Sequence, residues 1–234
     1  MSNYLNELLE SVKQNTAWDM ARLGKFTGSR LADLFVQPKT KAAQEAGEWS
    51  KTAESYIISK VMEMVTMIPA DSAHGPAIDH GNEWEETALR TLQMEIGSPE
   101  EKTNLQPGFK LFNSYSGASP DAFMELNGTK VGVEMKCPFN SVNHFHHSKV
   151  QTEADLKVVN PDYYWQVQMN MLTFNLGAWI FASFDPRQPD HRKLHYCVCY
   201  AVVEDMQLAC DVMEKAKHYR DKLVAEWMVD NNSK

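Results

Sequence analysis

The hydrophobic positions of the chain repeat with two different periods, so that helical and sheet-forming segments can be separated from the pattern alone. Apolar residues recur at helical spacing in the ranges 5–12, 29–35, 51–67, 83–94, 163–176 and 204–229. Alternating or continuous β-prone runs occupy 109–112, 120–126, 131–136, 178–184 and 194–203. We therefore predict one α/β (α+β) domain over residues 1–234, with a central mixed β-sheet flanked by helices. Its first part, about 1–100, is mostly helical, and about 105–234 holds the sheet and its flanking helices.

Composition narrows the class of protein. A chain of 234 residues supports one substantial core, and no Pro/Gly/Ser-rich linker or internal repeat divides it. No apolar run approaches the roughly 20 residues of a membrane span, and the N-terminus is too polar for a secretory signal. The four cysteines show no C-x-x-C spacing, which gives no indication of zinc or of a disulfide framework. We therefore expect a cytosolic protein that does not bind a membrane.

The net charge of −8 argues against a protein that coats nucleic acid, because non-specific DNA binding depends on Lys and Arg neutralising phosphates. It leaves room for an enzyme that contacts DNA through a small basic patch and metal ions.

The most informative segment is residues 119–136, SPDAFMELNGTKVGVEMK. Its Asn127-Gly128 pair between two alternating runs is a strong signal for a two-residue hairpin loop. If these two residues form the loop, Leu126 faces Thr129. The same register then places Asp121 opposite Glu134 and Ser119 opposite Lys136, with all four side chains on one face of the hairpin.

Two carboxylates that face each other across a β-ladder repel, and a divalent cation between them removes that repulsion. Oxygen ligands suit Mg²⁺ or Mn²⁺ better than zinc, and a neighbouring lysine can act on water or phosphate. The alternative is that Asp121 and Glu134 only mark the solvent-facing side of a sheet. Two features favour a site: Glu134 is the only charge in an apolar strand, and Cys137-Pro138 ends that strand just after Lys136.

Other polar residues are ambiguous from local sequence. Glu85 competes with Glu83 and Glu86 near the start of a predicted helix, where any carboxylate favours the helix dipole. Gln166 competes with Gln168 on a helix crowded with apolar groups.

A cation and a hydroxyl, Arg22 and Ser29, precede the helix predicted after Thr27-Gly28, an arrangement suited to anions, although Ser29 as a helix N-cap explains it equally. The cluster His144, His146 and His147 could touch phosphates or a metal, but an exposed loop is the better interpretation.

Five motifs in order give a resemblance that local patterns do not. They are R-L-G-x-x-T-G-S, H-G-x-x-W-E, S-P-D, E-M-K-C-P-F and W-Q-V-Q, and they extend over about residues 15 to 200. Together they resemble the phage lambda exonuclease family, the YqaJ-like viral recombinase nucleases of the PD-(D/E)-x-K superfamily. One departure is Ala122, where these proteins often carry Gly.

This resemblance implies a restriction-endonuclease-like nuclease fold and a Mg²⁺-dependent, processive 5′-to-3′ exonuclease acting on duplex DNA ends that carry a 5′-phosphate. Such an enzyme releases mononucleotides and leaves 3′ single-stranded tails for recombination with a single-strand annealing protein. The resemblance further implies a homotrimeric ring, encoded by a phage or prophage and located in the cytoplasm of a bacterial host.

The resemblance also implies roles for individual residues. Asp121, Glu134 and the main-chain oxygen of Met135 would bind metal, and Glu85 would serve a second metal ion. Lys136 would orient or deprotonate the attacking water, and Gln166 would help to position it. The remaining implied roles are a 5′-phosphate pocket and a wedge that splits the terminal base pairs; they fall to Arg22, Ser29 and Ser119 for the pocket and to Ile78 for the wedge.

Three other functions remain open from sequence. A structure-specific endonuclease or resolvase would share the metal site but cut within strands. A catalytically silent DNA-binding scaffold would keep only the fold, and a small-molecule phosphoesterase would use the same carboxylates. Aromatic residues near the site, among them Trp84 and Tyr163, suit base stacking and core packing equally.

Overall fold

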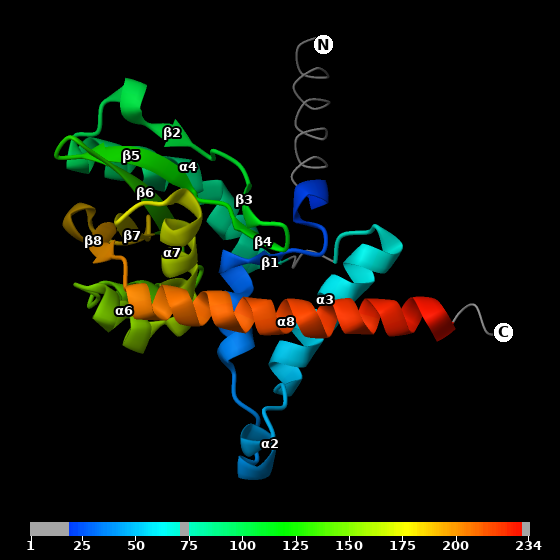
Figure 1. The fold of residues 1–234 in the computed structure, drawn as a ribbon. Coiled ribbons are helices and arrows are strands. Elements are labelled where there is room, and N and C mark those ends of the chain that lie inside the picture. Colours follow the sequence, from blue (N-terminus) through cyan, green and yellow to red (C-terminus); the bar gives the residue numbers. More distant parts are fainter. Residues whose placement is uncertain (1–18, 71–74, 231–234) are drawn as a thin grey trace, which may run out of the picture.

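The computed structural model describes residues 19–70 and 75–230, so the helix predicted over 5–12 lies outside the described residues. Figure 1 shows the arrangement of the elements. In chain order they are β1 (Phe26–Thr27), the 3₁₀ helix η1 (Gly28–Phe35), α2 (Lys41–Glu45), α3 (Lys51–Thr66), α4 (Pro76–Ile96), η2 (Glu100–Lys102), β2 (Asn104–Leu105), β3 (Lys110–Asn113), β4 (Ser116–Ala118), β5 (Ala122–Leu126), β6 (Thr129–Lys136), α5 (Ser141–His147), α6 (Glu153–Val159), α7 (Pro161–Phe174), β7 (Ala178–Phe184), η3 (Asp190–Arg192), β8 (Leu194–Tyr200) and α8 (Val203–Asp230).

Two sheets organise the described chain. The larger has the strand order β2-β5-β6-β7-β8, with β6 and β7 parallel and the other neighbours antiparallel. The smaller has the order β1-β4-β3, in which β1 and β4 are parallel. Because β4 leads through Ser119 and Pro120 directly into β5, the small sheet continues into the edge of the large one.

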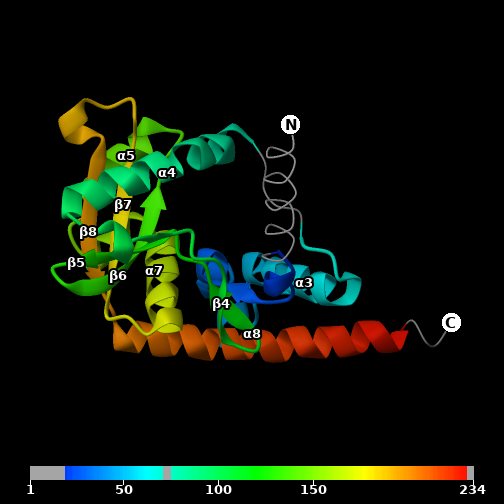
Figure 2. The same cartoon turned by 90° about the horizontal axis from the view of Figure 1, so that it is seen from above.

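The large sheet is buried on both faces, as a central β6–β7 pair requires. One face packs on α4 through a cluster that includes Leu89, Met124 and Ile180. The other face joins a larger core that includes Trp179 and Phe181 and also draws on η1, α3, α7 and α8. Figure 2 shows α8 running past the lower end of α7 and on past α3. The long C-terminal helix thus joins the sheet half of the molecule to the helical N-terminal half.

Most predicted elements are confirmed with small shifts of their ends. The helix predicted over 51–67 is α3, and those predicted over 163–176 and 204–229 are α7 and α8. The predicted strands correspond to β3, β5, β6, β7 and β8. No described helix is long and apolar enough to cross a membrane.

Two predicted starts are wrong. The helix expected to begin at Glu83 begins at Pro76, because proline fits the first helical position and Gly81 does not interrupt the helix. Glu85 therefore lies in the third turn, and Asp79 is the first-turn acid. The segment after Thr27 is a 3₁₀ helix whose N-cap is Thr27 and not Ser29.

Candidate active site

The hairpin of β5 and β6 has the predicted register but is shorter than expected. Asn127 and Gly128 adopt φ of 51° and 78°, the left-handed values of a tight hairpin loop, and Leu126 pairs with Thr129. The ladder ends at the pair Ala122–Val133. Asp121 lies just beyond it, with its N–H donating to the Val133 carbonyl at 3.2 Å.

The predicted pairing of Ser119 with Lys136 is wrong. Ser119 follows β4, whose partners are β1 and β3, and it does not take part in the β5–β6 ladder. Pro120 stands between Ser119 and Asp121, and because it has no N–H it cannot extend the antiparallel ladder in this direction.

The carboxylate pair itself is present, with Glu134 buried and Asp121 half-buried. Glu134 is 0% exposed, so the solvent-facing interpretation does not hold for it. Its Oε1 accepts from Lys136 Nζ at 2.5 Å, and its Oε2 accepts from Asn170 Nδ2 at 2.9 Å. Asp121 Oδ2 accepts the main-chain N–H of Met135 at 2.7 Å, which fixes this carboxylate beside the end of β6.

The electrostatics of this group favour a bound cation. Burial, reinforced by the charge of Glu134, raises the pKa of Asp121 well above its ordinary value. Burial also raises the pKa of Glu134, although Lys136 and Asn170 oppose the effect. Burial would lower the pKa of Lys136, but the negative charges of Glu134 and Asp121 outweigh it and raise that pKa. One lysine therefore compensates two carboxylates incompletely.

The two competing glutamines have separate positions on α7. Gln166 Oε1 lies 3.4 Å from Lys136 Nζ, at the C-terminal end of β6. Gln168 is fully buried and ties α7 to β8 and the segment after it, donating to the Tyr200 carbonyl and accepting from Val202 N–H. Gln166 is therefore the glutamine at the site, and Gln168 has a structural role.

Glu85 is the acid of α4 that faces the site. Its charge contributes to raising the pKa of Asp121, after burial and Glu134. Its Oε1 accepts from Gln106 Nε2 at 3.2 Å, while Gln106 N–H donates to the Asp121 carbonyl at 2.8 Å. Gln106 thus connects Glu85 to Asp121, a role that its sequence position does not reveal.

A cavity of about 500 Å³ opens in front of these groups. Its lining includes Ile78, Glu85, Lys136, Phe139 and Tyr163. Ile78 is 38% exposed and lies in the first turn of α4, not upstream of the helix as predicted. An apolar side chain therefore lines the same cavity as Lys136.

The ligand chemistry fits Mg²⁺ or Mn²⁺. The repelling carboxylates of Asp121 and Glu134 and the main-chain oxygen of Met135 are hard oxygen donors, and Mg²⁺ keeps several waters among its ligands. Among the described residues, no three His, Cys, Asp or Glu side chains are grouped closely enough to hold a metal by themselves. Asp121 and Glu134 would therefore supply the charged ligands, and water would complete the set.

The residues expected to recognise a phosphate lie around the small sheet, next to the carboxylates. The β1–β4 register pairs Thr27 with Gly117, and Ser29 and Ser119 each lie two residues beyond that pair. Ser29 is exposed, and its Oγ is 3.3 Å from Thr27 Oγ1. Because Ser119 is two residues before Asp121, this group directly adjoins the candidate metal site.

Arg22 belongs to a group of cations arranged around the buried ring of Tyr56. Arg30 Cζ and Lys60 Nζ lie 4.3 Å and 5.5 Å from that ring centroid, and the Tyr56 hydroxyl accepts the N–H of Thr27 at 2.9 Å. Burial lowers the pKa of Arg22, while Tyr56 and nearby acids oppose the effect. Arg30 pairs with Asp33 and Lys60 pairs with Glu63, so the three cations lie here among acidic partners.

The histidine cluster is not an exposed loop, which corrects the prediction. It forms α5, in which His144 and His147 are buried. Their ring Nδ1 atoms lie 2.9 Å and 3.1 Å from Ser183 Oγ. Burial lowers the pKa of His147 to about 4, so it is neutral at physiological pH. These two histidines dock α5 onto β7.

The fold and the site define an α+β domain in which a D…E-x-K set lies at the end of a central strand pair. The chain matches the model of the YqaJ-like viral recombinase domain over residues 17–176 and belongs to this family.

Solved structures share the fold. The chain resembles LHK-Exo, an alkaline exonuclease from Laribacter hongkongensis, with a TM-score of 0.74 and 20% identity over 93% of this chain and 98% of that one. The same enzyme in complex with dAMP gives a TM-score of 0.75, 21% identity and the same coverage. A phage-related exonuclease from Haemophilus somnus gives 0.70 and 19% over 87% and 96%. No curated protein sequence gives a significant match to the chain.

Proposed function

We propose that this protein is a Mg²⁺-dependent deoxyribonuclease that degrades one strand of duplex DNA from its 5′ end and leaves a 3′ single-stranded tail. Its membership of a viral recombinase family and its fold likeness to alkaline exonucleases support a nuclease. The observation that carries the proposal is the adjacency of two groups. The carboxylate pair at Asp121 and Glu134 adjoins a group at the small sheet that offers the Arg22 guanidinium and two hydroxyls, and the two are connected through Ser119 and Pro120.

The carboxylate group supports in-line displacement at phosphorus. A divalent ion, when bound, polarises a phosphate oxygen and makes water a better nucleophile. Lys136, which its raised pKa keeps protonated, supplies positive charge beside the developing phosphorane and orients water toward it. Gln166 and Glu134 fix the lysine, and Asn170 holds the second oxygen of Glu134.

The cationic group supports the choice of end. A terminal 5′-phosphate carries more charge than an internal diester, and Arg22 with Ser29 and Ser119 offers a guanidinium and two hydroxyls to it. Binding the terminal phosphate there would place a nearby phosphodiester bond beside Asp121. The cavity in front of Lys136 has space for a nucleotide, and dAMP is bound by the fold neighbour LHK-Exo. Release of mononucleotides follows from this placement.

Three further features concern strand separation, a second metal ion and the oligomeric state. Ile78 at the rim of the cavity would separate the terminal base pairs, and Glu85 would serve a second metal ion through water. Processive action would come from a homotrimeric ring around the duplex, and a single-strand annealing protein would take up the tail. The recombinase family and the resemblance of the motifs support these last two features.

The first test compares a linear duplex with 5′-phosphates to the same DNA as a covalently closed circle, each with Mg²⁺ and with a chelator. We expect mononucleotides from the linear form only, and single strands as the remaining product. Asp121→Asn serves as the control for contaminating nucleases.

Three other results of this digestion experiment would contradict the proposed activity. Cleavage of the circle would replace the proposal with an endonuclease on the same fold. Equal digestion from 3′ ends would refute the polarity, and inactivity on both substrates would favour a DNA-binding scaffold.

A further inference from the structure

Two buried charges of opposite sign hold the backbone of a single residue, Gly24, near the N-terminus of the described chain. Gly24 N–H donates to Glu63 Oε2 at 2.8 Å, and Arg220 Nη1 donates to the Gly24 carbonyl at 2.6 Å. Glu63 and Arg220 are each only 5% exposed. Gly24 has φ of +66°, and a Cβ at this position would lie 2.4 Å from the Met64 side chain. Backbone conformation and space therefore both require glycine here.

Neither charge belongs to the catalytic group, and each is compensated where it lies. Glu63 Oε1 accepts from Lys60 Nζ at 2.7 Å, and Arg220 Nη2 donates to Asp221 Oδ1 at 2.7 Å. Arg220 Cζ also lies 5.5 Å from the centroid of the Phe26 ring. Buried groups that are paired and hydrogen-bonded in this way have fixed orientations. We call Gly24, Glu63 and Arg220 the Gly24 clamp.

The Gly24 clamp sits inside the segment that carries Arg22 and Ser29. Lys25 N–H donates to the Arg22 carbonyl at 2.9 Å, which closes a turn around Gly24. Phe26 and Thr27 then pair with β4, and Phe26 N–H donates to the Tyr115 carbonyl at 2.9 Å. The backbone from Arg22 to β1 is thus fixed by α3 and α8 on one side and by the small sheet on the other.

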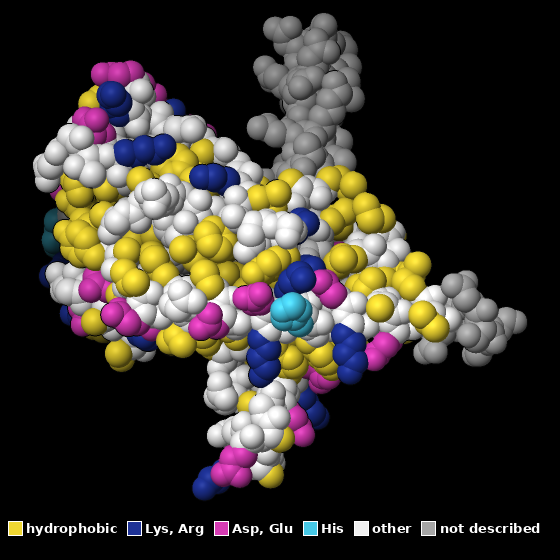
Figure 3. All heavy atoms as spheres, in the orientation of Figure 1, with side chains coloured by type: hydrophobic (Ala, Val, Ile, Leu, Met, Phe, Trp, Pro, Cys, Tyr) yellow, Lys and Arg dark blue, Asp and Glu magenta, His cyan; other side chains and the backbone are white. Residues whose placement is uncertain are grey.

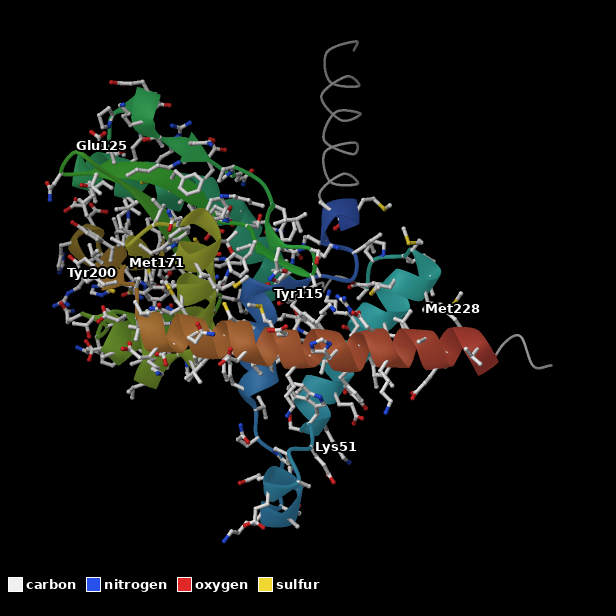
Figure 4. The ribbon with its side chains drawn as sticks, in the orientation of Figure 1. Lys51, Tyr115, Glu125, Met171, Tyr200 and Met228 are labelled. Carbon is white, nitrogen blue, oxygen red and sulfur yellow. The ribbon has the colours of Figure 1, made fainter. Side chains whose placement is uncertain are left out.

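The half of the clamp on α8 comes from the far end of the sequence. Arg220 is 196 residues from Gly24, and α8 lies outside residues 17–176, which match the family model. In Figure 4, α8 runs from the end near Tyr200 to the end near Met228, and Tyr115 lies beside its middle. The face of α8 in Figure 3 carries exposed charges of both signs, so its buried arginine differs from the rest of that surface.

We infer that Arg220 and Glu63 are positioning residues for recognition of the 5′ end, and that they act by holding the N–H and the carbonyl of Gly24 so that Arg22 meets the terminal phosphate. This inference rests on the proposed function. It assigns α8 a role in end selection, although α8 contributes no side chain to the carboxylate site.

The test uses Arg220→Gln and Arg220→Lys in the full-length protein, with Tyr219→Phe as the matched control. Tyr219 donates from the same helix to Glu54 on α3 at 3.1 Å, so its loss weakens the α8–α3 contact without touching Gly24. The measured quantity is the ratio of kcat/KM on 5′-phosphate ends to that on 5′-hydroxyl ends. Binding of a 5′-phosphorylated oligonucleotide without Mg²⁺ and thermal melting are followed in parallel.

We expect Arg220→Gln to lower this ratio roughly ten- to hundredfold, the scale of a binding group displaced by about 1 Å. Arg220→Lys keeps a donor and a charge, and should recover part of the ratio even if Arg220→Gln folds poorly. Tyr219→Phe should leave the ratio unchanged.

The inference fails alone if the wild type prefers phosphorylated ends and both Arg220 variants keep that preference, or if Tyr219→Phe loses it equally. A wild type with no preference would instead refute the phosphate pocket, and the inference with it. These two failures are distinguishable from the wild-type measurement.

Discussion

The carboxylate group and the cationic group of this protein lie side by side but are assembled in opposite ways. Asp121 and Met135 are 14 residues apart on one hairpin, whereas Gly24 is held by residues 39 and 196 positions away. Asp121, Glu134 and Lys136 thus come from one hairpin, although Gln166 and Asn170 join them from α7. The cations around Tyr56 come from separate elements. On the proposed function, the core of the cleavage site lies in one short segment, and the choice of end depends on contacts between distant parts of the chain.

The largest expected effect comes from Asp121→Asn. This variant keeps a side-chain oxygen for the Met135 N–H but loses a metal ligand, and we expect activity to fall about a thousandfold or more. The loss should be the same on phosphorylated and hydroxyl ends, since the cationic group is untouched. Rates of Mg²⁺-dependent digestion and Mg²⁺ titration calorimetry measure it.

The melting temperature of the metal-free Asp121→Asn protein should not fall, because one of two repelling carboxylates is gone. Retained Mg²⁺-dependent cleavage would remove Asp121 from the site.

Arg22→Gln should give a smaller and more selective effect. A hydrogen bond to a charged group contributes about 1.5–3 kcal/mol, which corresponds to roughly ten- to hundredfold on 5′-phosphate ends. Digestion from 5′-hydroxyl ends should change much less, because the carboxylate group is intact. Lys41→Gln is the control, since Lys41 is an exposed lysine whose one described ion pair is with Glu45. Equal losses on both kinds of end would show that Arg22 does not recognise the 5′-phosphate.

Asn170→Ala tests the support of Glu134 within the carboxylate group. On the proposed function, the hydrogen bond from Asn170 to Glu134 would orient a metal ligand, and loss of such a partner typically lowers metal affinity or activity by about tenfold or more. Gln168→Ala on the same helix is the matched control, because Gln168 bonds only to backbone groups near β8. Calorimetry should show weaker Mg²⁺ binding for Asn170→Ala and unchanged affinity for Gln168→Ala, which should instead melt earlier. The reverse pattern would make Asn170 structural.

The smallest expected effect is on pH dependence. A carboxyl group with a raised pKa in the folded state stabilises the fold at low pH, and that contribution is lost as pH rises through the raised value. Burial raises the pKa of both Asp121 and Glu134, and the negative charge of Glu134 adds to the effect on Asp121 while that of Glu85 adds to the effect on Glu134. A bound cation requires both groups ionised, so its affinity rises with pH.

The increase in melting temperature caused by saturating Mg²⁺ should therefore be larger at about pH 8 than at about pH 5. Asp121→Asn should reduce this pH dependence. An increase independent of pH would show that the cation binds elsewhere.

The sequence predicts local features of this molecule well. The Asn127-Gly128 loop alone gives the register of β5 and β6, because a two-residue loop leaves one pairing for its flanking strands. That register does not extend past Pro120, because its missing N–H ends the ladder. The start of α4 lies before the predicted Glu83, because a helix tolerates a glycine such as Gly81 at a cost of about 1 kcal/mol.

Long-range partners could not be predicted. Asn170 and Gln106 touch the site through a helix and a loop whose distance from β6 is set by packing, and nothing in their local sequence distinguishes them from ordinary polar residues. His144 and His147 on α5 meet Ser183 on β7, 36 or more residues further along the chain. The choice of Gln166 over Gln168 likewise required knowing which face of α7 meets Lys136.

The Gly24 clamp has a consequence for how the protein is made. Chains emerge from the ribosome N-terminus first and elements form as they appear. Glu63 can reach Gly24 early, and the β5–β6 hairpin can form soon after it emerges, but Arg220 is nearly two hundred residues behind its partner. A nascent chain would therefore bring Asp121, Glu134 and Lys136 together on their hairpin before Gly24 has both of its partners. On the proposed function, the preference between DNA ends would be acquired last, when α8 closes on the segment around Gly24.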